Sequence, residues 1–226
     1  ILIKFRKKIM CGFIGHFNCD RKNSDKFSSR IKHRGPDNTS VTQNNNWNVE
    51  FCRLSINDLS SSGNQPFKVG KITSFINGEI YNFRNLKKLF NENTFISNSD
   101  CEIIPHLYQK FGIKFIEKLD GMFSIVLIDE SLNKLYLIKD AYGKKPLYYK
   151  KVNNSKCIEF SSEQRLPFNK SDISSENLKT LLFHHFKFYD QTPFRNQHSI
   201  PPGSYLEYSN NKIEIIKWYK LKKQNF

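Results

Sequence analysis

The 226-residue chain has no uninterrupted apolar segment of the roughly 18 residues that a membrane-spanning helix needs. Its apolar start, Ile1-Leu2-Ile3, is too short for the hydrophobic region of a secretory signal peptide. No internal repeat and no low-complexity linker interrupts the sequence. Hydrophobic residues at 38% and aromatic residues at 14% are enough for a packed core. We therefore expect a globular protein with no membrane partner and a cytoplasmic location.

Cysteine is sparse, and its spacing excludes several kinds of site. The chain has five cysteines, an odd number, with no Cys-x-x-Cys pair and no closely spaced histidine pair. This pattern argues against a zinc site and against a disulfide framework, and a reducing cytosol is its natural setting. We therefore expect no metal and no cofactor in this part of the protein.

Acidic residues are few relative to basic ones, and the formal net charge is +15. A basic nucleic-acid-binding protein would also show such an excess, with steeply salt-dependent affinity for DNA or RNA. However, the lysines are scattered along the chain, and no block rich in lysine and arginine stands beside aromatic residues. Asn, Ile, Phe and Lys are all heavily used, as an AT-rich genome would produce. We therefore expect no nucleic-acid partner.

The apolar patterns predict strands at both ends of the chain and helices between them. The helical pieces are expected at 27–32, 82–93, 99–112, 115–119 and from 174 onward, and Pro105 should distort the first turn of the second long helix. Strands are expected at 10–17, 47–54, 72–76, 122–128, 134–139, 146–152, 156–160, 205–208 and 213–218. This order predicts an α+β fold with two antiparallel sheets packed together and helices outside.

Cys11 follows Met10 directly. If Met10 were removed, the thiol would be the nucleophile, and the free α-amine, with an unperturbed pKa of roughly 7.7–8.0, would be its base. A lone cysteine at the start of a strand is otherwise a small buried residue. The choice between these readings depends on the residues further along the chain.

Several other residues could together bind a free amino acid and stabilise a negative charge. Asn77-Gly78 offers two neutral donors for an oxyanion, although Asn-Gly is also a strong hairpin signal. Arg53 suits a carboxylate, unless it is a solvated surface residue. Glu79 and Asp100 suit an ammonium group, although Asp100 is also well placed to cap a helix. One cation and two anions match the zwitterionic head of a free amino acid, which indicates acyl transfer from an amino-acid side-chain amide.

Nine short motifs occur in order along the chain. They are Cys11-Gly12-Phe13-Ile14-Gly15, His33-Arg34-Gly35-Pro36-Asp37, Arg53-Leu54-Ser55-Ile56, Asn77-Gly78-Glu79-Ile80-Tyr81-Asn82, Ser99-Asp100-Cys101-Glu102, Leu119-Asp120-Gly121-Met122-Phe123, Asp140-Ala141-Tyr142-Gly143-Lys144-Lys145-Pro146-Leu147-Tyr148-Tyr149, Phe160-Ser161-Ser162-Glu163 and Pro201-Pro202-Gly203. Over residues 10 to about 220, the sequence resembles the glutaminase domain of glutamine-hydrolysing asparagine synthetases. These are class II glutamine amidotransferases with an N-terminal-nucleophile fold of αββα layers.

The resemblance implies a role for each matching position. Cys11 would attack the glutamine side-chain amide and form a γ-glutamyl thioester, and Asn77 and Gly78 would hold the oxyanion. Arg53 would bind the α-carboxylate of glutamine. The remaining positions would bind the α-amine (Glu79 and Asp100), line the pocket (Leu54, Ser55, Ile56 and Asn57) or shape a loop over the site (Arg34 and Asp37).

The resemblance also divides the chain and implies partners. Residues 1–9 are expected to be an upstream extension absent from the mature protein, residues 10–220 the amidotransferase domain, and residues 221–226 the start of a linker. The implied partner is a C-terminal ATP-pyrophosphatase domain, which would bind ATP and Mg²⁺ and use the ammonia to make asparagine. A homodimer would also be consistent. The open alternatives are another ammonia acceptor, such as a surface sugar, and a non-catalytic glutamine-binding module.

Overall fold

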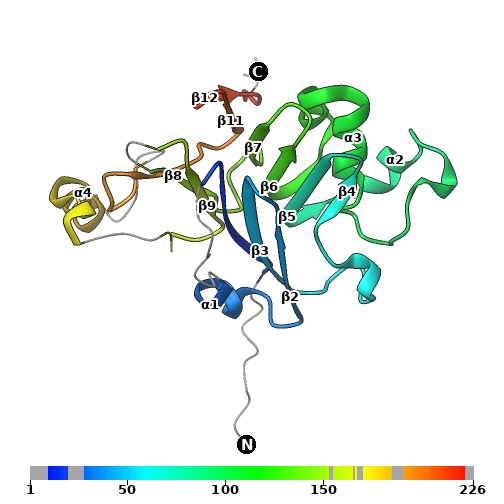
Figure 1. The fold of residues 1–226 in the computed structure, drawn as a ribbon, viewed down its shortest axis with the longest axis horizontal. Coiled ribbons are helices and arrows are strands. Elements are labelled where there is room, and N and C mark those ends of the chain that lie inside the picture. Colours follow the sequence, from blue (N-terminus) through cyan, green and yellow to red (C-terminus); the bar gives the residue numbers. More distant parts are fainter. Residues whose placement is uncertain are drawn as a thin grey trace, which may run out of the picture.

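A computed structural model describes residues 10–19, 28–152, 155–164, 166, 170–184 and 191–221. Its centre is two six-stranded sheets that face each other (Figure 1). The first sheet has the order β10-β8-β9-β1-β3-β2, with bounds Gln197–Ser199, Tyr148–Lys151, Ile158–Ser161, Gly12–Phe17, Trp47–Arg53 and Asn38–Gln43. The second has the order β12-β11-β7-β6-β5-β4, with bounds Lys212–Lys217, Ser204–Ser209, Lys134–Lys139, Gly121–Asp129, Ile72–Ile80 and Phe67–Val69. All neighbouring strands run antiparallel, which confirms the predicted fold class.

The main core lies between the sheets. Alternate residues of β1 and β3 point inward, and they meet inward residues of β5, β6 and β7 because strand side chains alternate between faces. Phe51 of β3 packs near Phe75 of β5, with ring centroids 6.3 Å apart. The two sheets are therefore held together mainly by apolar burial.

The outer faces of the sheets are covered unequally. Helix α3 (Ile103–Phe111) packs on the second sheet, where Leu107 and Phe115 contribute to a second apolar cluster with Ile125. A smaller cluster on the first sheet joins Ile14 to Ile31 of α1 (Ser28–Ile31). Figure 1 shows α3 and α1 on these two outer sides. The other helices are α2 (Phe83–Lys87), α4 (Ser175–His184) and the 3-10 turns η1 (Lys32–Arg34), η2 (Ser61–Gly63), η3 (Glu92–Thr94), η4 (Gly112–Lys118) and η5 (Lys170–Asp172).

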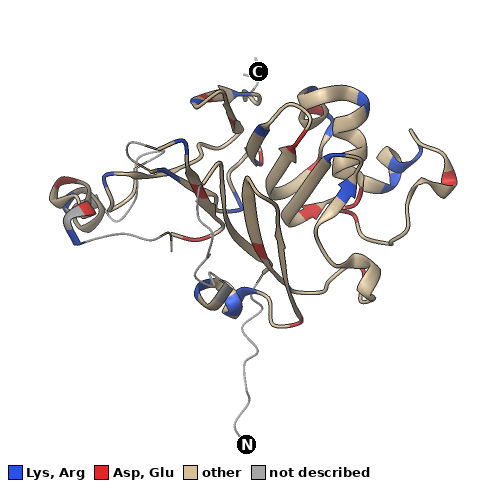
Figure 2. Ribbon diagram, in the orientation of Figure 1, with Lys and Arg blue, Asp and Glu red and all other residues tan. Residues whose placement is uncertain are grey.

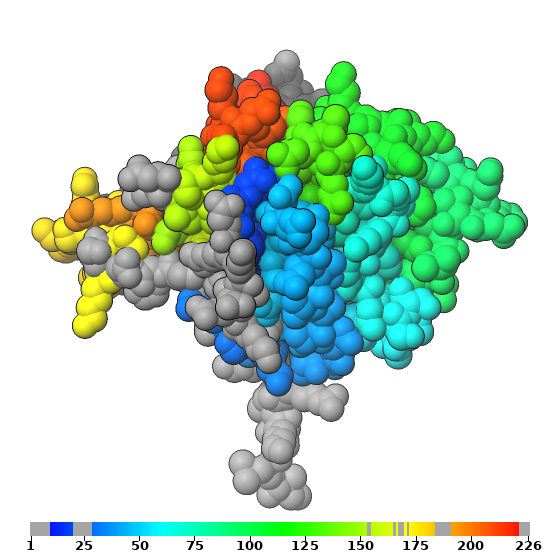
Figure 3. All heavy atoms as spheres, viewed as in Figure 1, coloured from blue at the N-terminus to red at the C-terminus, as the bar shows by residue number. Residues whose placement is uncertain are grey.

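Distant parts of the sequence become neighbours in the second sheet. Figure 3 shows the orange and red residues of β11 and β12 against the green residues near β7. Their register pairs Leu206 with Leu137, across almost seventy positions of sequence. In Figure 2 the basic residues are spread over helices, strands and loops. No helix among the described residues is long and apolar enough to cross a membrane.

Several local predictions were wrong. The helix expected over 82–93 is α2 alone, with a separate turn at Glu92–Thr94. For Asn77-Gly78 the structure excludes the hairpin alternative, because both residues lie inside β5. Asp100 does not cap α3, whose N-cap residue is Glu102. Pro105 falls in the first turn of α3, where backbone N–H groups have no helical partner, so it does not distort the helix.

The prediction of no disulfide was also wrong. Cys19 and Cys157 form a disulfide across a sequence separation of 138 residues. Cys19 follows β1 and Cys157 precedes β9, and these strands pair so that Phe17 lies opposite Ile158. The sheet register brings the two cysteines together, and sequence spacing alone carries no sign of this.

Candidate functional site

A cavity opens at the end of the sandwich where β1 begins. Gly12 of β1 pairs with Cys52 of β3, so Cys11 and Arg53 lie side by side just beyond that pair. The other walls come from β5 and from the segment before α3. The lining residues are Cys11, Arg53, Leu54, Ile56, Asn57, Asp58, Gly63, Gln65, Ile76, Gly78, Glu79, Ser99, Asp100 and Cys101. The fold thus gathers eight of the twelve candidate site residues around one space.

The Cys11 thiol is held by the backbone of Leu54. The Leu54 N–H donates to Sγ at 3.2 Å, and Sγ lies 3.3 Å from the Leu54 carbonyl oxygen. Burial raises the pKa of the Cys11 thiol, while the Leu54 N–H and the positive charges of Arg53 and Arg34 act in the opposite direction. Because burial dominates, this thiol needs a base to become a nucleophile near neutral pH.

Arg34 fixes the main chain of Cys11. Its Nε donates to the Cys11 carbonyl oxygen at 2.9 Å, and its Nη1 donates to Glu163 at 2.9 Å. His33 contacts the same Glu163 oxygen at 2.8 Å, and the hydrogen bonds from Arg34 and His33 lower the pKa of Glu163. Arg34 therefore acts behind Cys11 and does not line the cavity.

Arg53 is buried and oriented by a loop. Its Nη1 donates to the Ser60 carbonyl oxygen at 2.8 Å and to Asn64 Oδ1 at 2.6 Å. Its Nη2 donates to the Asp58 carbonyl oxygen. A guanidinium has five N–H donors, so two have no partner among the described residues and are available to a ligand. A Cβ at Gly63 would clash with this guanidinium, so the loop needs glycine there.

Acidic residues also line the cavity. Asp100 is 3% exposed, and its two oxygens accept from Asn57 Nδ2 at 2.9 Å and from the Ile80 N–H at 2.6 Å. Glu79 lines the same space. A cavity lined by both a guanidinium and carboxylates suits a zwitterion.

Asn77 and Gly78 lie on β5 beside the cavity. Asn77 is fully buried on the same strand face as Phe75 and Glu79, and its Nδ2 is 3.5 Å from Ser124 Oγ. Its Oδ1 has no hydrogen-bond partner among the described residues. Gly78 has a φ of 152°, and a Cβ there would clash with the Met122 carbonyl oxygen. Any other residue at position 78 would therefore force β5 away from β6.

Two candidate residues support the loop from outside the cavity. The Ser55 N–H donates to Asp37 Oδ2 at 2.8 Å. The Asp37 N–H donates to the Arg53 carbonyl oxygen at 3.1 Å. Ser55 and Asp37 thus connect the segment after β3 to the turn after η1, and neither lines the cavity.

Sequence reasoning missed the residues that hold the functional groups. It gave no role to Asp58, Ser60 or Asn64, which orient Arg53 largely through backbone carbonyls that leave no sequence signal. Hydrogen bonds from Ser60 lower the pKa of Asp58. Glu163 belongs to a recognised motif, but nothing in the motif connected it with Arg34.

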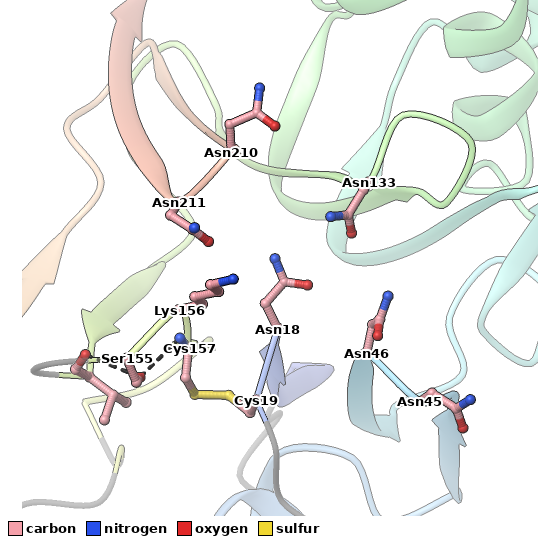
Figure 4. Close-up of a pocket in the computed structure, with 11 residues that line it drawn as sticks. Asn18, Cys19, Asn45, Asn46, Asn133, Ser155, Lys156, Cys157, Asn210 and Asn211 are labelled. Carbon is pink, nitrogen blue, oxygen red and sulfur yellow. Dashed lines mark hydrogen bonds between the residues drawn. A yellow bond between two sulfur atoms is a disulfide. The ribbon is translucent and has the colours of Figure 1, made fainter.

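A second cavity, of about 780 Å³, lies at the other end of β1 (Figure 4). Its walls are mainly asparagines, together with Lys156 and the Cys19–Cys157 disulfide. Asn18, Asn133, Asn210 and Asn211 all have positive φ. Asparagine adopts this conformation more easily than most residues. The asparagine side chains are therefore concentrated here because several turns of the chain lie at this end of β1. Among the described residues, no group of three or more His, Cys, Asp or Glu could hold a metal ion.

Comparison with known proteins gives consistent results. Residues 10–219 match the family model described as "Glutamine amidotransferase domain". A Bacillus subtilis relative named asparagine synthetase [glutamine-hydrolyzing] 2 is 37% identical over 170 residues, which cover 71% of this chain and 22% of that protein. An Arabidopsis thaliana asparagine synthetase [glutamine-hydrolyzing] 1 is 39% identical over 147 residues, or 62% of this chain and 25% of that protein.

One further relative has a different name. The amidase chry2 of Gibberella zeae is 36% identical over 190 residues, which cover 81% of this chain and 28% of that protein. The chain thus spans about a quarter of the length of these curated relatives.

A solved structure shares the fold. The glutamine phosphoribosylpyrophosphate amidotransferase from B. subtilis, complexed with ADP and GMP, matches with a TM-score of 0.66 at 13% identity. The match covers 92% of this chain and 49% of that one, and it confirms the N-terminal-nucleophile type of fold. With the family match over residues 10–219, the chain belongs to the glutamine amidotransferase domain family.

Proposed function

We propose that this domain hydrolyses glutamine to glutamate and ammonia through a thioester on Cys11. The observation that carries the proposal is the meeting of the Cys11 thiol, the Arg53 guanidinium and the Asp100 carboxylate in one cavity. A free amino acid bound between Arg53 and Asp100 would bring its side chain toward the thiol. Glu79 would share its ammonium group with Asp100, and Leu54 to Asn57 would line its path.

The reaction proceeds in two halves. The Cys11 α-amine, freed by removal of Met10, takes the thiol proton as Sγ attacks the amide carbon of glutamine. The same proton passes to the leaving nitrogen, ammonia departs and a γ-glutamyl thioester forms. Water then attacks the thioester, the α-amine accepts its proton and returns it to sulfur, and glutamate is released.

Asn77 and Gly78 would hold the negative oxygen of both tetrahedral intermediates. The oxygen and nitrogen of an amide side chain are interchangeable in shape. With the Asn77 amide reversed, its oxygen would accept from the Ser124 hydroxyl, 3.5 Å from the present nitrogen. The amide nitrogen would then take the position that has no partner and could donate to the oxyanion. This arrangement supports the role of Asn77.

The fate of the ammonia is part of the same proposal. We infer that it amidates aspartate to asparagine in a synthetase domain that binds ATP and Mg²⁺, in a cytoplasmic enzyme. The support is the names of the Bacillus and Arabidopsis relatives, of whose length this chain covers 22% and 25%. The amidase relative supports a second candidate, in which the same glutaminase reaction supplies a different acceptor.

The deciding experiment joins intact mass to turnover. Two versions of the chain are expressed, one starting at Met10 and one starting at Ile1, and glutamate release from glutamine is measured for each. We expect the first to begin at Cys11 by mass and to hydrolyse glutamine, and the second, where it keeps residues 1–10, to be inactive. A protein that begins at Cys11 and binds glutamine without hydrolysing it would instead be a binding module.

A further inference from the structure

Lys145 is a buried lysine whose side chain lies next to Met10, the residue before Cys11. It lies between β7 and β8 and is 3% exposed. Its Nζ lies 2.6 Å from the Met10 thioether sulfur, and within the described part of the chain this is the one hydrogen bond of the Lys145 side chain. A thioether is a weak acceptor, and a buried ammonium normally has a strong one. Lys145 is therefore placed for something other than Met10.

The turn that carries Lys145 is rigid. Asp140 is fully buried, and one of its oxygens accepts from the Tyr142 and Lys144 N–H groups at 3.1 Å and 3.0 Å. The other oxygen accepts from the Lys145 N–H at 3.0 Å and the Phe123 N–H at 3.3 Å. Because Asp140 holds both the turn and β6, the main chain of Lys145 has little freedom to move away from Met10.

Charged groups on several elements surround the ammonium. The carboxylates of Glu79 on β5 and Asp140 after β7 favour its charged form, and Arg34 of η1 opposes it. The Cys11 thiol is close enough to interact with it as well. Burial lowers the pKa of Lys145, and the carboxylates counteract this effect. Glu79, Asp140 and Arg34 thus act on the Lys145 ammonium, while Arg34 and Arg53 act on Cys11.

Removal of Met10 changes what Lys145 faces. Hydrolysis of the bond between Met10 and Cys11 consumes one water and leaves a free amine on Cys11. The Met10 side chain departs with its residue, so the Lys145 ammonium loses this contact next to the residue that carries the new amine. A nearby cation disfavours protonation of an amine, whereas Glu79 and Asp140 would favour it.

We propose that Lys145 is a positioning residue for the Cys11 α-amine, which it keeps unprotonated and therefore basic at neutral pH. This inference rests on the proposed glutaminase function, in which the amine is the base. The protein needs that base to be neutral because burial holds the thiol in its protonated form. Lys145 would thus add a positive charge to those of Arg53 and Arg34, which already act on Cys11.

The test uses the chain expressed from Met10 and verified by mass to begin at Cys11. The variants are Lys145→Met, which removes the charge, and Lys145→Arg, which keeps it. Lys144→Met is the matched control, because Lys144 is the exposed neighbour in the same turn. Two readouts are taken across pH: kcat for glutamine hydrolysis, and the ¹⁵N chemical shift of the Cys11 α-amine in protein labelled with ¹⁵N-cysteine.

We expect Lys145→Met to move the acidic limb of the kcat profile upward by about one pH unit, with the same shift in the amine titration. Below the wild-type midpoint this is a loss of about tenfold, and it disappears at higher pH. Lys145→Arg and Lys144→Met should keep the wild-type midpoint. Thermal unfolding of all four proteins reports whether each is folded.

Two outcomes would overturn the inference. One is a Lys145→Met protein whose amine titrates as in the wild type. The other is a loss of kcat that is the same at every pH and is shared by Lys145→Arg, which would make Lys145 a packing residue. A wild-type protein without glutaminase activity would refute the proposed function, and the amine titration would still test the effect of Lys145 on its neighbour.

Discussion

The two ends of β1 carry cavities of opposite character. The end near Asn18 has a space of about 780 Å³ walled mainly by neutral amides. The end near Cys11 has a much smaller space that brings together a thiol, a guanidinium and two carboxylates. These ends are about 20 Å apart along a strand of six residues. Cavity volume is therefore a poor guide to function in this protein. The reactive and charged side chains line the smaller cavity, where backbone groups hold them in place.

The ends also differ in how their residues are fixed. At the Asn18 end, the positive-φ asparagines follow from chain reversals, and each would serve its turn without any ligand. At the Cys11 end, Arg53 is bound by three acceptors and Asp100 by two donors, although neither position is needed to close a turn. Buried polar groups that are held in place in this way lower the stability of the protein unless a ligand binds to them. Such an arrangement is typical of functional sites.

The largest expected effect is loss of the nucleophile. Cys11→Ala should reduce glutamine turnover by at least about 10⁴-fold, because no other described thiol could replace Sγ beside the Leu54 N–H. Glutamate release measures the effect, and thermal unfolding reports the fold. Cys52→Ala is the matched control: this buried cysteine on β3 lies outside the cavity. Turnover that survives in Cys11→Ala would remove Cys11 from the mechanism.

The next effect concerns the oxyanion. Asn77→Ala should lower kcat by about 10²- to 10³-fold while KM changes little, because its amide would act mainly in the transition state. Steady-state kinetics separates the two constants. Ser124→Ala is a second test, since it keeps the Asn77 amide and removes the hydroxyl that would orient it, so a smaller fall in kcat is expected. A rise in KM with kcat intact would assign Asn77 to ground-state binding.

A smaller effect is expected from the carboxylate contact. Arg53→Ala should raise KM for glutamine about 100-fold with a lesser change in kcat, because it removes a charge-assisted bond to substrate. Arg53→Lys should recover only part of the affinity, since a lysine cannot form a bidentate pair. An unchanged KM in Arg53→Ala would show that Arg53 does not bind the α-carboxylate. Asp100 would then be the next residue to test for an effect on KM.

Much of this arrangement could be predicted from sequence, and the reasons are local. The segment 122–128 is apolar except for Ser124, and it lies within strand β6, whose two faces are both buried. Cys11, Arg53 and Asp100 stand in short motifs, so their residue types could be read one by one. The two antiparallel sheets followed from the order of strands and helices.

The rest depends on contacts between distant segments. Arg53 is oriented by carbonyl oxygens of Asp58 and Ser60, which any residue would supply. Lys145 meets Met10 across 135 positions, and nothing in either segment indicates the other. The Asn77-Gly78 pair was ambiguous because the same two residues favour a hairpin, and only the pairing of Gly78 with Phe123 resolves it. Register is a property of the folded sheet, so these relations become visible only in three dimensions.

The smallest effect on activity, and the sharpest test of the comparison, is expected at the disulfide end. The double variant Cys19→Ser with Cys157→Ser should lower the free energy of unfolding by about 2–4 kcal/mol, because the crosslink closes a long loop. It should leave kcat and KM for glutamine within about twofold, since both residues lie at the far end of β1 from Cys11. Denaturant unfolding measures the first quantity, and wild-type protein treated with a reductant should approach the variant. A large fall in kcat in a folded double variant would mean that the two ends of β1 are coupled. The geometry of the Cys11 site would then depend on the disulfide at the other end of the strand.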